Sequence, residues 1–260
     1  MFKGTSASAG IGIGKAVIVE EAELVITRNE VADAEGEIQR FRGALEKTIA
    51  ATQKMADDLA SRVGEKEAEI MQGHMMLLSD PMLTGEIESS IRNDKVNSEF
   101  AIENVCNMYA DMFASMGDEL MQQRATDMRD IKVRMQRTLM GLESVDVSLL
   151  PKGSILVAKD LTPSMTAGIN PENVSGIVTE LGGKTSHSAI LARALEIPAV
   201  VAVNGLMDAV KDGDKVVLDG STGEVFVDPE ASVEKEYEEK RKQFLKDTKE
   251  LQKYIGQSSV

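Results

Sequence analysis

Apolar residues recur three or four positions apart between about Ala32 and Leu142, which is the spacing of amphipathic helices. Asp80 and Pro81 form a helix-start signal, because aspartate is a preferred N-cap and proline fits the first helical turn. Gly141 marks the end of the last helix. We therefore expect an all-helical bundle in residues 23–143. The expected helices cover residues 38–63, 70–78, 82–91, 98–116 and a final run that ends at 141.

Outside this region the pattern changes to short runs of β-branched and apolar residues separated by turn residues. Ile11–Val19 predicts a strand before the bundle, and this strand needs a sheet to join. The bundle is therefore expected to interrupt an α/β domain of residues 1–22 and 144–230, followed by a charged linker helix in 231–260. The other predicted elements are strands at 154–158, 175–179, 199–203, 215–219 and 224–228, and a helix at 186–196.

The composition is that of a soluble globular protein, with 42% hydrophobic and 28% charged residues among 260. A formal net charge of -14 argues against a nucleic-acid partner, because phosphates would be repelled. The single cysteine excludes an intrachain disulfide, and the sequence has no apolar run of about 18 residues to span a membrane. We expect a cytoplasmic protein that has no membrane contact.

His187 stands out chemically, because the chain has only two histidines and one cysteine. A zinc site would need more ligands, and the sequence contains neither a G-x-S-x-G elbow nor a phosphate-binding P-loop. The sequence pattern predicts a loop directly before His187 and a helix after it. Glycines allow backbone conformations in which the amide N–H groups point at a bound anion, and a helix N-terminus attracts anions. The loop therefore suits a phosphoryl group. The loop consists of Gly182, Gly183, Lys184, Thr185 and Ser186.

A lone histidine near a helix start is more often structural than catalytic, so these residues alone leave both interpretations open. Three further residues are interpreted as structural. His74 falls on or beside the buried stripe of its helix, and Cys106 falls on the apolar side of another. Arg193 lies six residues after His187 and so turns away from the ring, where we expect it to pair with Glu196.

Six stretches of the chain together resemble a known family. The histidine loop looks like that of the swivelling domains found in phosphoenolpyruvate-using enzymes. With the other stretches, in the same order, it resembles the N-terminal half of the Enzyme I family of bacterial phosphoenolpyruvate:sugar phosphotransferase systems. The resemblance implies a swivelling α/β domain interrupted by a helical insert. The stretches are Ser6–Ala16, Gly73–Asp80, Arg124–Ile131, Asp160–Ser164, Gly182–Arg193 and Ile197–Val201.

The resemblance also implies roles for particular residues. His187 would be phosphorylated through Nε2 and exchange its phosphate with a histidine of the small phosphocarrier protein HPr. Thr166 matches a threonine that orients the histidine, whereas Asp160 and Thr162 are interpreted as cap or turn residues. The bundle would dock HPr. The matching docking positions are Glu65, Met76, Leu77, Leu83 and Arg124.

Phosphoenolpyruvate and its Mg²⁺ would belong to a C-terminal domain that this sequence lacks. No metal or other cofactor is therefore expected in this chain, and the fragment is expected to be a monomer. The sequence also departs from the family pattern. Lys184 stands where many relatives carry arginine, and Pro81 with Met82 replaces an acidic pair, which reduces the local docking charge.

Two alternatives remain open. A pyruvate phosphate dikinase or phosphoenolpyruvate synthase would carry a similar swivelling domain, but those relatives do not place a helical insert before the loop. A helical adaptor without chemistry would leave the loop as ordinary structure. Binding of an HPr-like protein to the bundle would argue against the first, and phosphorylation of His187 would argue against the second.

Overall fold

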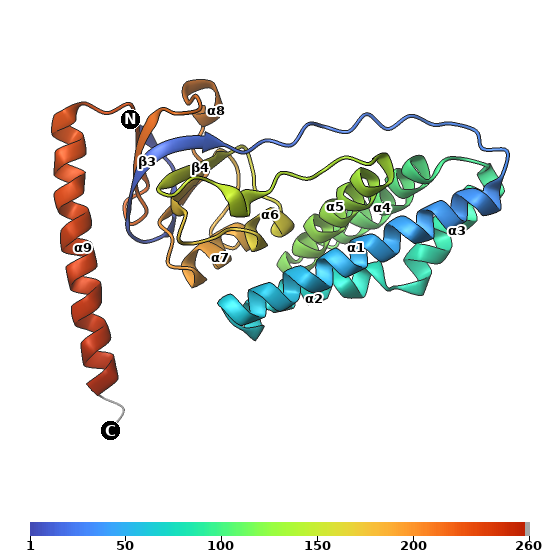
Figure 1. Ribbon diagram of the computed structural model, residues 1–260, viewed down its shortest axis with the longest axis horizontal. Coiled ribbons are helices and arrows are strands. Elements are labelled where there is room, and N and C mark those ends of the chain that lie inside the picture. The colour runs from blue at the N-terminus through green and yellow to red at the C-terminus, as the bar shows by residue number, and fades with distance from the viewer. Residues whose placement is uncertain (258–260) are drawn as a thin grey trace. The chain divides into compact units, whose positions relative to one another are not determined.

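The computed structural model describes residues 1–257, and contacts within the chain divide it into two compact units. The helical unit comprises residues 21–145 and 162–168. The α/β unit comprises residues 1–20 and 146–161 and continues from 169 onward. An α/β fold combined with an all-α fold is the predicted fold class, which the structure confirms (Figure 1).

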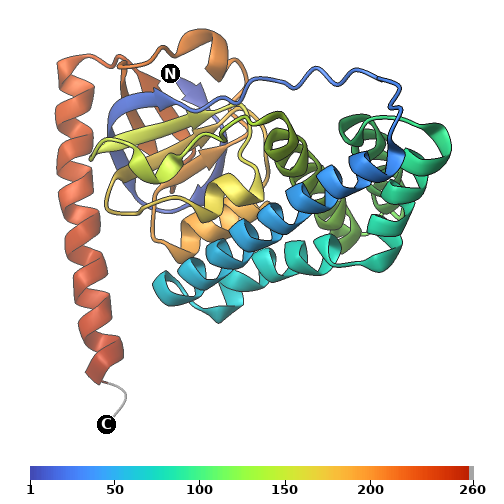
Figure 2. The same cartoon turned by 45° about the vertical axis from the view of Figure 1, so that its right-hand side comes forward.

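Five long helices form the body of the helical unit. Figure 2 shows this unit from a second side. The amphipathic spacing of their sequences brings one apolar face of each into a common core. Ile38 and Phe41 of the first helix are fully buried there, together with Ile87 and Ile131 from later helices. The helices are α1 (Ala34–Arg62), α2 (Glu65–Leu78), α3 (Pro81–Asp94), α4 (Ser98–Ser115) and α5 (Glu119–Met140).

The ends of these helices follow the signals in the sequence. Asp80 caps α3 by accepting a hydrogen bond from the Met82 backbone amide at 2.9 Å, and Pro81 occupies the first helical turn. Gly141 ends α5 in a left-handed conformation with φ of 67°, which glycine adopts without steric cost. Both signals were used to predict the helix boundaries, and both are confirmed.

The short helix α6 (Pro163–Ala167) also belongs to the helical unit, although the prediction assigned its residues to the α/β domain. Polar contacts explain the difference. Ser164 donates two hydrogen bonds to Asp130 on α5, and Arg62 of α1 donates to the Ala167 carbonyl at 2.8 Å. These contacts link positions more than 30 residues apart, so sequence pattern alone did not show them.

The α/β unit is built on one mixed sheet, which has eight strands within the described residues, in the order β1-β8-β7-β3-β4-β5-β6-β2. Strands β3, β4, β5 and β6 are parallel to one another, whereas β7, β8, β1 and β2 join antiparallel. The strands are β1 (Phe2–Lys3), β2 (Thr5–Ser8), β3 (Ile11–Ile18), β4 (Ser154–Ala158), β5 (Val174–Thr179), β6 (Ala199–Val201), β7 (Lys215–Asp219) and β8 (Glu224–Val227).

Strands β1 and β2 were not predicted, because they are short and carry no alternating apolar pattern. They lie at the two edges of the sheet, where β2 pairs with β6 and β1 pairs with β8. The centre of the sheet is apolar, with Ile155, Val178 and Val216 fully buried. The short helices α7 (His187–Ala194) and α8 (Leu206–Ala209) follow β5 and β6 along the chain.

The long C-terminal helix α9 (Ala231–Gln257) packs its first half on the α/β unit (Figure 1). Tyr237 is buried there, its hydroxyl donates to Glu224 at 2.7 Å, and its ring lies 5.2 Å from that of Phe226. Farther along, Leu251 and Ile255 are exposed. Within residues 1–257, no helix is long and apolar enough to cross a membrane.

Candidate functional site

His187 is the first residue of α7, directly after the loop that follows β5. The preceding residue, Ser186, is the N-cap of the helix, and its hydroxyl accepts a hydrogen bond from the Ala189 amide at 3.3 Å. The predicted loop and the histidine therefore lie together at a helix N-terminus, where the helix dipole favours an anion. His187 is half-buried.

Hydrogen bonds within the loop hold it in a tight turn. The Ser186 hydroxyl donates to the Gly183 carbonyl at 2.7 Å, and the Ser186 amide donates to the same carbonyl at 3.1 Å. Gly182 has a φ of 102°, which a residue with a side chain rarely adopts. The side chains of Lys184 and Thr185 are exposed. The backbone thus forms the turn, and these two side chains lie at its surface.

Arg193 connects this loop to the edge of the sheet. Its guanidinium donates to the Lys184 carbonyl at 3.0 Å and to the Ala7 carbonyl of β2 at 2.9 Å. The structural role that we inferred for Arg193 agrees with these contacts, but its partners are backbone carbonyls rather than Glu196. Carbonyl partners leave no signal in a sequence, because every residue has one.

The remaining predicted site residues belong to the helical unit. Thr166 lies in α6, where it is buried, and its hydroxyl donates to the Thr162 carbonyl at 2.9 Å. Thr162 caps α6 by accepting from the Met165 amide, as a cap residue should. The orienting role that the resemblance implies for Thr166 therefore stays a prediction.

The predicted docking residues lie mainly on α2 and α3. Glu65 is exposed at the start of α2, Met76 is 69% exposed, and Leu77 is partly buried against the core. Leu83 is only 2% exposed and packs inside that core, so its side chain offers almost no area to a partner. Arg124, on α5, is half-buried with its guanidinium against Gly73.

The interpretation of His74 as a structural residue fits its surroundings. Its side chain is fully buried, and Nε2 lies 3.0 Å from Oδ1 of Asp127 on α5. Cys106 is also fully buried, and burial raises the pKa of its thiol to about 12. A thiol with that pKa stays protonated at neutral pH and is a poor nucleophile.

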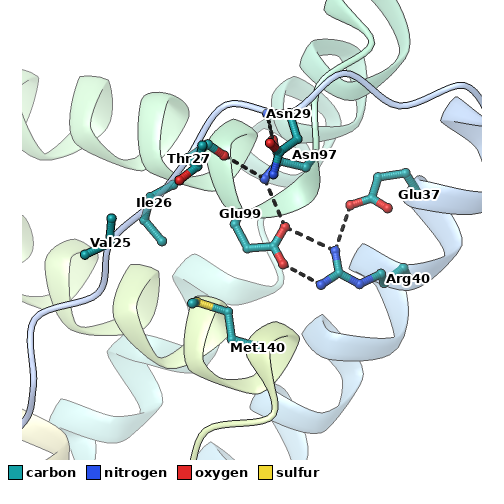
Figure 3. A pocket seen from close by; sticks show the side chains of 9 residues that line it. All are labelled: Val25, Ile26, Thr27, Asn29, Glu37, Arg40, Asn97, Glu99 and Met140. Carbon is teal, nitrogen blue, oxygen red and sulfur yellow. Dashed lines mark hydrogen bonds and ion pairs between the residues drawn. The ribbon is translucent and has the colours of Figure 1, made fainter.

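A separate pocket of about 360 Å³ lies in the helical unit, between the extended segment 21–33 and the helices. Figure 3 shows that its polar side chains point toward one another. Arg40 donates to Glu37 at 2.8 Å and to both carboxylate oxygens of Glu99, and Asn97 donates to the Thr27 carbonyl at 3.1 Å. The Asn97–Thr27 bond attaches the extended segment to the helices, whereas the bonds from Arg40 to Glu99 join α1 to α4.

Two families match most of the chain. The family described as PEP-utilising enzyme, N-terminal, matches residues 3–124, and the one described as PEP-utilising enzyme, mobile domain, matches residues 150–223. The fold and the histidine loop thus define a member of the phosphoenolpyruvate-utilising enzymes.

The chain is 39% identical to the protein in a solution NMR structure of Enzyme I (nEIt). The match covers 94% of this chain and 99% of that chain, and its TM-score is 0.81. It is 26% identical to the N-terminal domain of Enzyme 1 - Nitrogen, at 92% and 98% coverage and a TM-score of 0.59. The chain belongs to the Enzyme I family.

Curated relatives named phosphoenolpyruvate-protein phosphotransferase agree with this assignment. Those of Bacillus subtilis and Staphylococcus carnosus are each 40% identical to this chain over 259 residues, and the alignment covers all of this chain. The chain spans about 45% of the length of these relatives. The predicted family is therefore confirmed.

Proposed function

We propose that this chain carries out phosphoryl transfer through a phosphohistidine at His187, exchanging the group with a histidine of HPr. The observation that supports this most is the place of His187, which is the first residue of a helix after a tight, glycine-containing turn. The names of the aligned relatives favour the phosphotransferase system over the dikinase alternative.

The chemistry requires an in-line exchange between two ring nitrogens. The neutral His187 ring attacks phosphorus with a nitrogen lone pair while the P–N bond to the donor histidine breaks, and the departing nitrogen keeps the bonding electrons. The phosphoryl group carries its negative charge on three oxygens, and the transition state is loose, so positioning and positive potential do most of the catalysis. The first-turn amides of α7 and the charge of Lys184 supply that potential.

The phosphate-holding role extends to the whole loop in this proposal. Gly182 and Gly183 allow the backbone to turn closely around the group, and Ser186 maintains the turn through its bond to the Gly183 carbonyl. Lys184 and Thr185 are the exposed side chains that would contact the phosphate oxygens. Lysine provides a compact charge rather than the bidentate fork of arginine, so we expect one contact from it.

The helical unit is the proposed partner surface. HPr would meet α2 around Met76 and Leu77, with Glu65 and Arg124 supplying charges beside these apolar side chains. Use of phosphoenolpyruvate and Mg²⁺ is proposed for the longer protein, outside the region that this chain shares with its relatives. A cytoplasmic location and a monomeric fragment also stay predictions.

Incubation with phosphorylated HPr tests the proposal. The chain should acquire a radioactive phosphate that is stable to alkali and labile to acid, and unlabelled HPr should remove it again. His187→Ala should acquire none, while circular dichroism shows an unchanged helix content. Lys211→Ala, which alters an exposed lysine elsewhere in the α/β unit, is the control and should be labelled normally. Labelling of the His187→Ala variant would overturn the assignment.

A further inference from the structure

Gly73 and Arg124 meet where α2 packs against α5. A methyl group added to Gly73 would lie 2.9 Å from Nη1 of Arg124 and 3.9 Å from Cζ of the same side chain. Apart from the two neighbouring residues and the backbone of its own helix, no other described atom lies within 4 Å of that methyl position. The guanidinium of Arg124 therefore occupies the space that any side chain at position 73 would need.

The residues around Gly73 show where along α2 and α5 this contact lies. The next residue, His74, contacts Asp127 of α5 at 3.0 Å, and Asp127 follows Arg124 by three residues on the same helix. Met76 follows Gly73 by three positions and so shares its face of α2. The arginine guanidinium consequently lies about one helical turn from a methionine that is 69% exposed.

Helix stability gives no reason for a glycine at this position. Glycine in a helix interior is destabilising relative to alanine, because it loses more backbone entropy on folding. Alanine at 73 would conflict only with the far end of a flexible arginine side chain, which can adopt another rotamer. What glycine alone allows is this particular position of the guanidinium.

We propose that Gly73 is a positioning residue for Arg124, and that the absence of a side chain at position 73 places the guanidinium on α2 about one helical turn from Met76. A partner that docks on this face then meets a cation and an apolar side chain together, and it must present an anionic or carbonyl acceptor next to an apolar contact. Within residues 1–257 Arg124 forms no salt bridge, so its charge is available to that partner. The inference rests on the proposed exchange with HPr.

Gly73→Ala tests the inference against a matched control, Gly85→Ala. Gly85 is also inside a helix of the same unit, but a methyl group added there meets no atom within 4 Å. We expect Gly73→Ala and Arg124→Ala each to weaken HPr binding about tenfold by titration calorimetry. The double variant should bind no more weakly than Arg124→Ala. KM for HPr should rise while kcat stays within about twofold, and Gly85→Ala should match the wild type.

Two further measurements separate positioning from folding and from the proposed function. Thermal unfolding should show that neither glycine variant is less stable than the wild type. In NMR spectra the Arg124 Nε–H resonance should move in Gly73→Ala and stay in place in Gly85→Ala, whether or not HPr binds. An unmoved resonance, unchanged HPr affinity in Gly73→Ala, or losses that multiply in the double variant would overturn the inference. Absence of HPr binding by the wild type would instead contradict the proposed function.

Discussion

Ser164 donates both its backbone amide and its hydroxyl to the carboxylate of Asp130, at 2.9 and 2.8 Å. Asp130 is only 5% exposed on α5, and Ser164 lies in the first turn of α6. These two hydrogen bonds attach α6 to α5. Thr166 lies two residues after Ser164 in α6 and is held in place with it. The threonine that the family pattern associates with the histidine is therefore held by the helical unit.

Removal of this tie should loosen α6 at a measurable cost. Ser164→Ala loses one hydrogen bond to a charged group and should lower the free energy of unfolding by about 1 kcal/mol in urea titrations. Asp130→Ala leaves two donors without their acceptor and should cost about 2–3 kcal/mol. In the double variant the losses should fall short of their sum. Fully additive losses would mean that the two residues act separately.

Arg193 should affect the rate of phosphoryl exchange without contacting the phosphate. Arg193→Ala frees the Lys184 carbonyl and the edge strand, so the loop is less well positioned and exchange with HPr should slow about tenfold. His187 should still become fully labelled at long times. Arg193→Lys keeps one donor and should recover part of the rate. Complete loss of labelling in Arg193→Ala would indicate a direct chemical role instead.

The Arg40–Glu99 pair should make stability depend on pH in the acid range. Burial is the largest single influence and raises the pKa of Glu99. Hydrogen bonds from Arg40, Asn97 and the backbone, together with the positive charge of Arg40, outweigh it, so the pKa lies below its usual value of 4.5. The folded state therefore gains stability above pH 4.5 and loses it as the pH falls through the lowered pKa. Glu99→Gln should reduce stability at pH 7 by about 1–2 kcal/mol and flatten the acid decline. An equally steep decline in the variant would assign it to other carboxylates.

Local sequence signals predicted most of the regular structure. The strand predicted at 154–158 has those bounds, and the helix predicted at 186–196 extends over His187–Ala194. Such elements are specified by periodicity and by residues at their ends, which act over a few positions. The glycine pair and the helix start likewise located the loop around His187 before its structure was known.

Contacts between distant residues were not predictable in this way. The bonds of Arg193 go to backbone carbonyls, and the space that Gly73 leaves for Arg124 depends on how two helices pack. Leu83 is a second example. The family pattern suggested that it docks a partner, but packing places its side chain in the core, where it is 2% exposed. Packing of this kind is decided by the whole fold rather than by a local pattern.

The most direct test of the central claim is to locate the phosphoryl group after the chain has reacted with phosphorylated HPr. The sequence helps, because it contains only His74 and His187 and they fall in separate peptides. Mass spectrometry of a digest kept at alkaline pH should find the added phosphate on the peptide with His187, lost after mild acid. Phosphate on His74, on a serine or threonine, or nowhere in the chain would contradict the account.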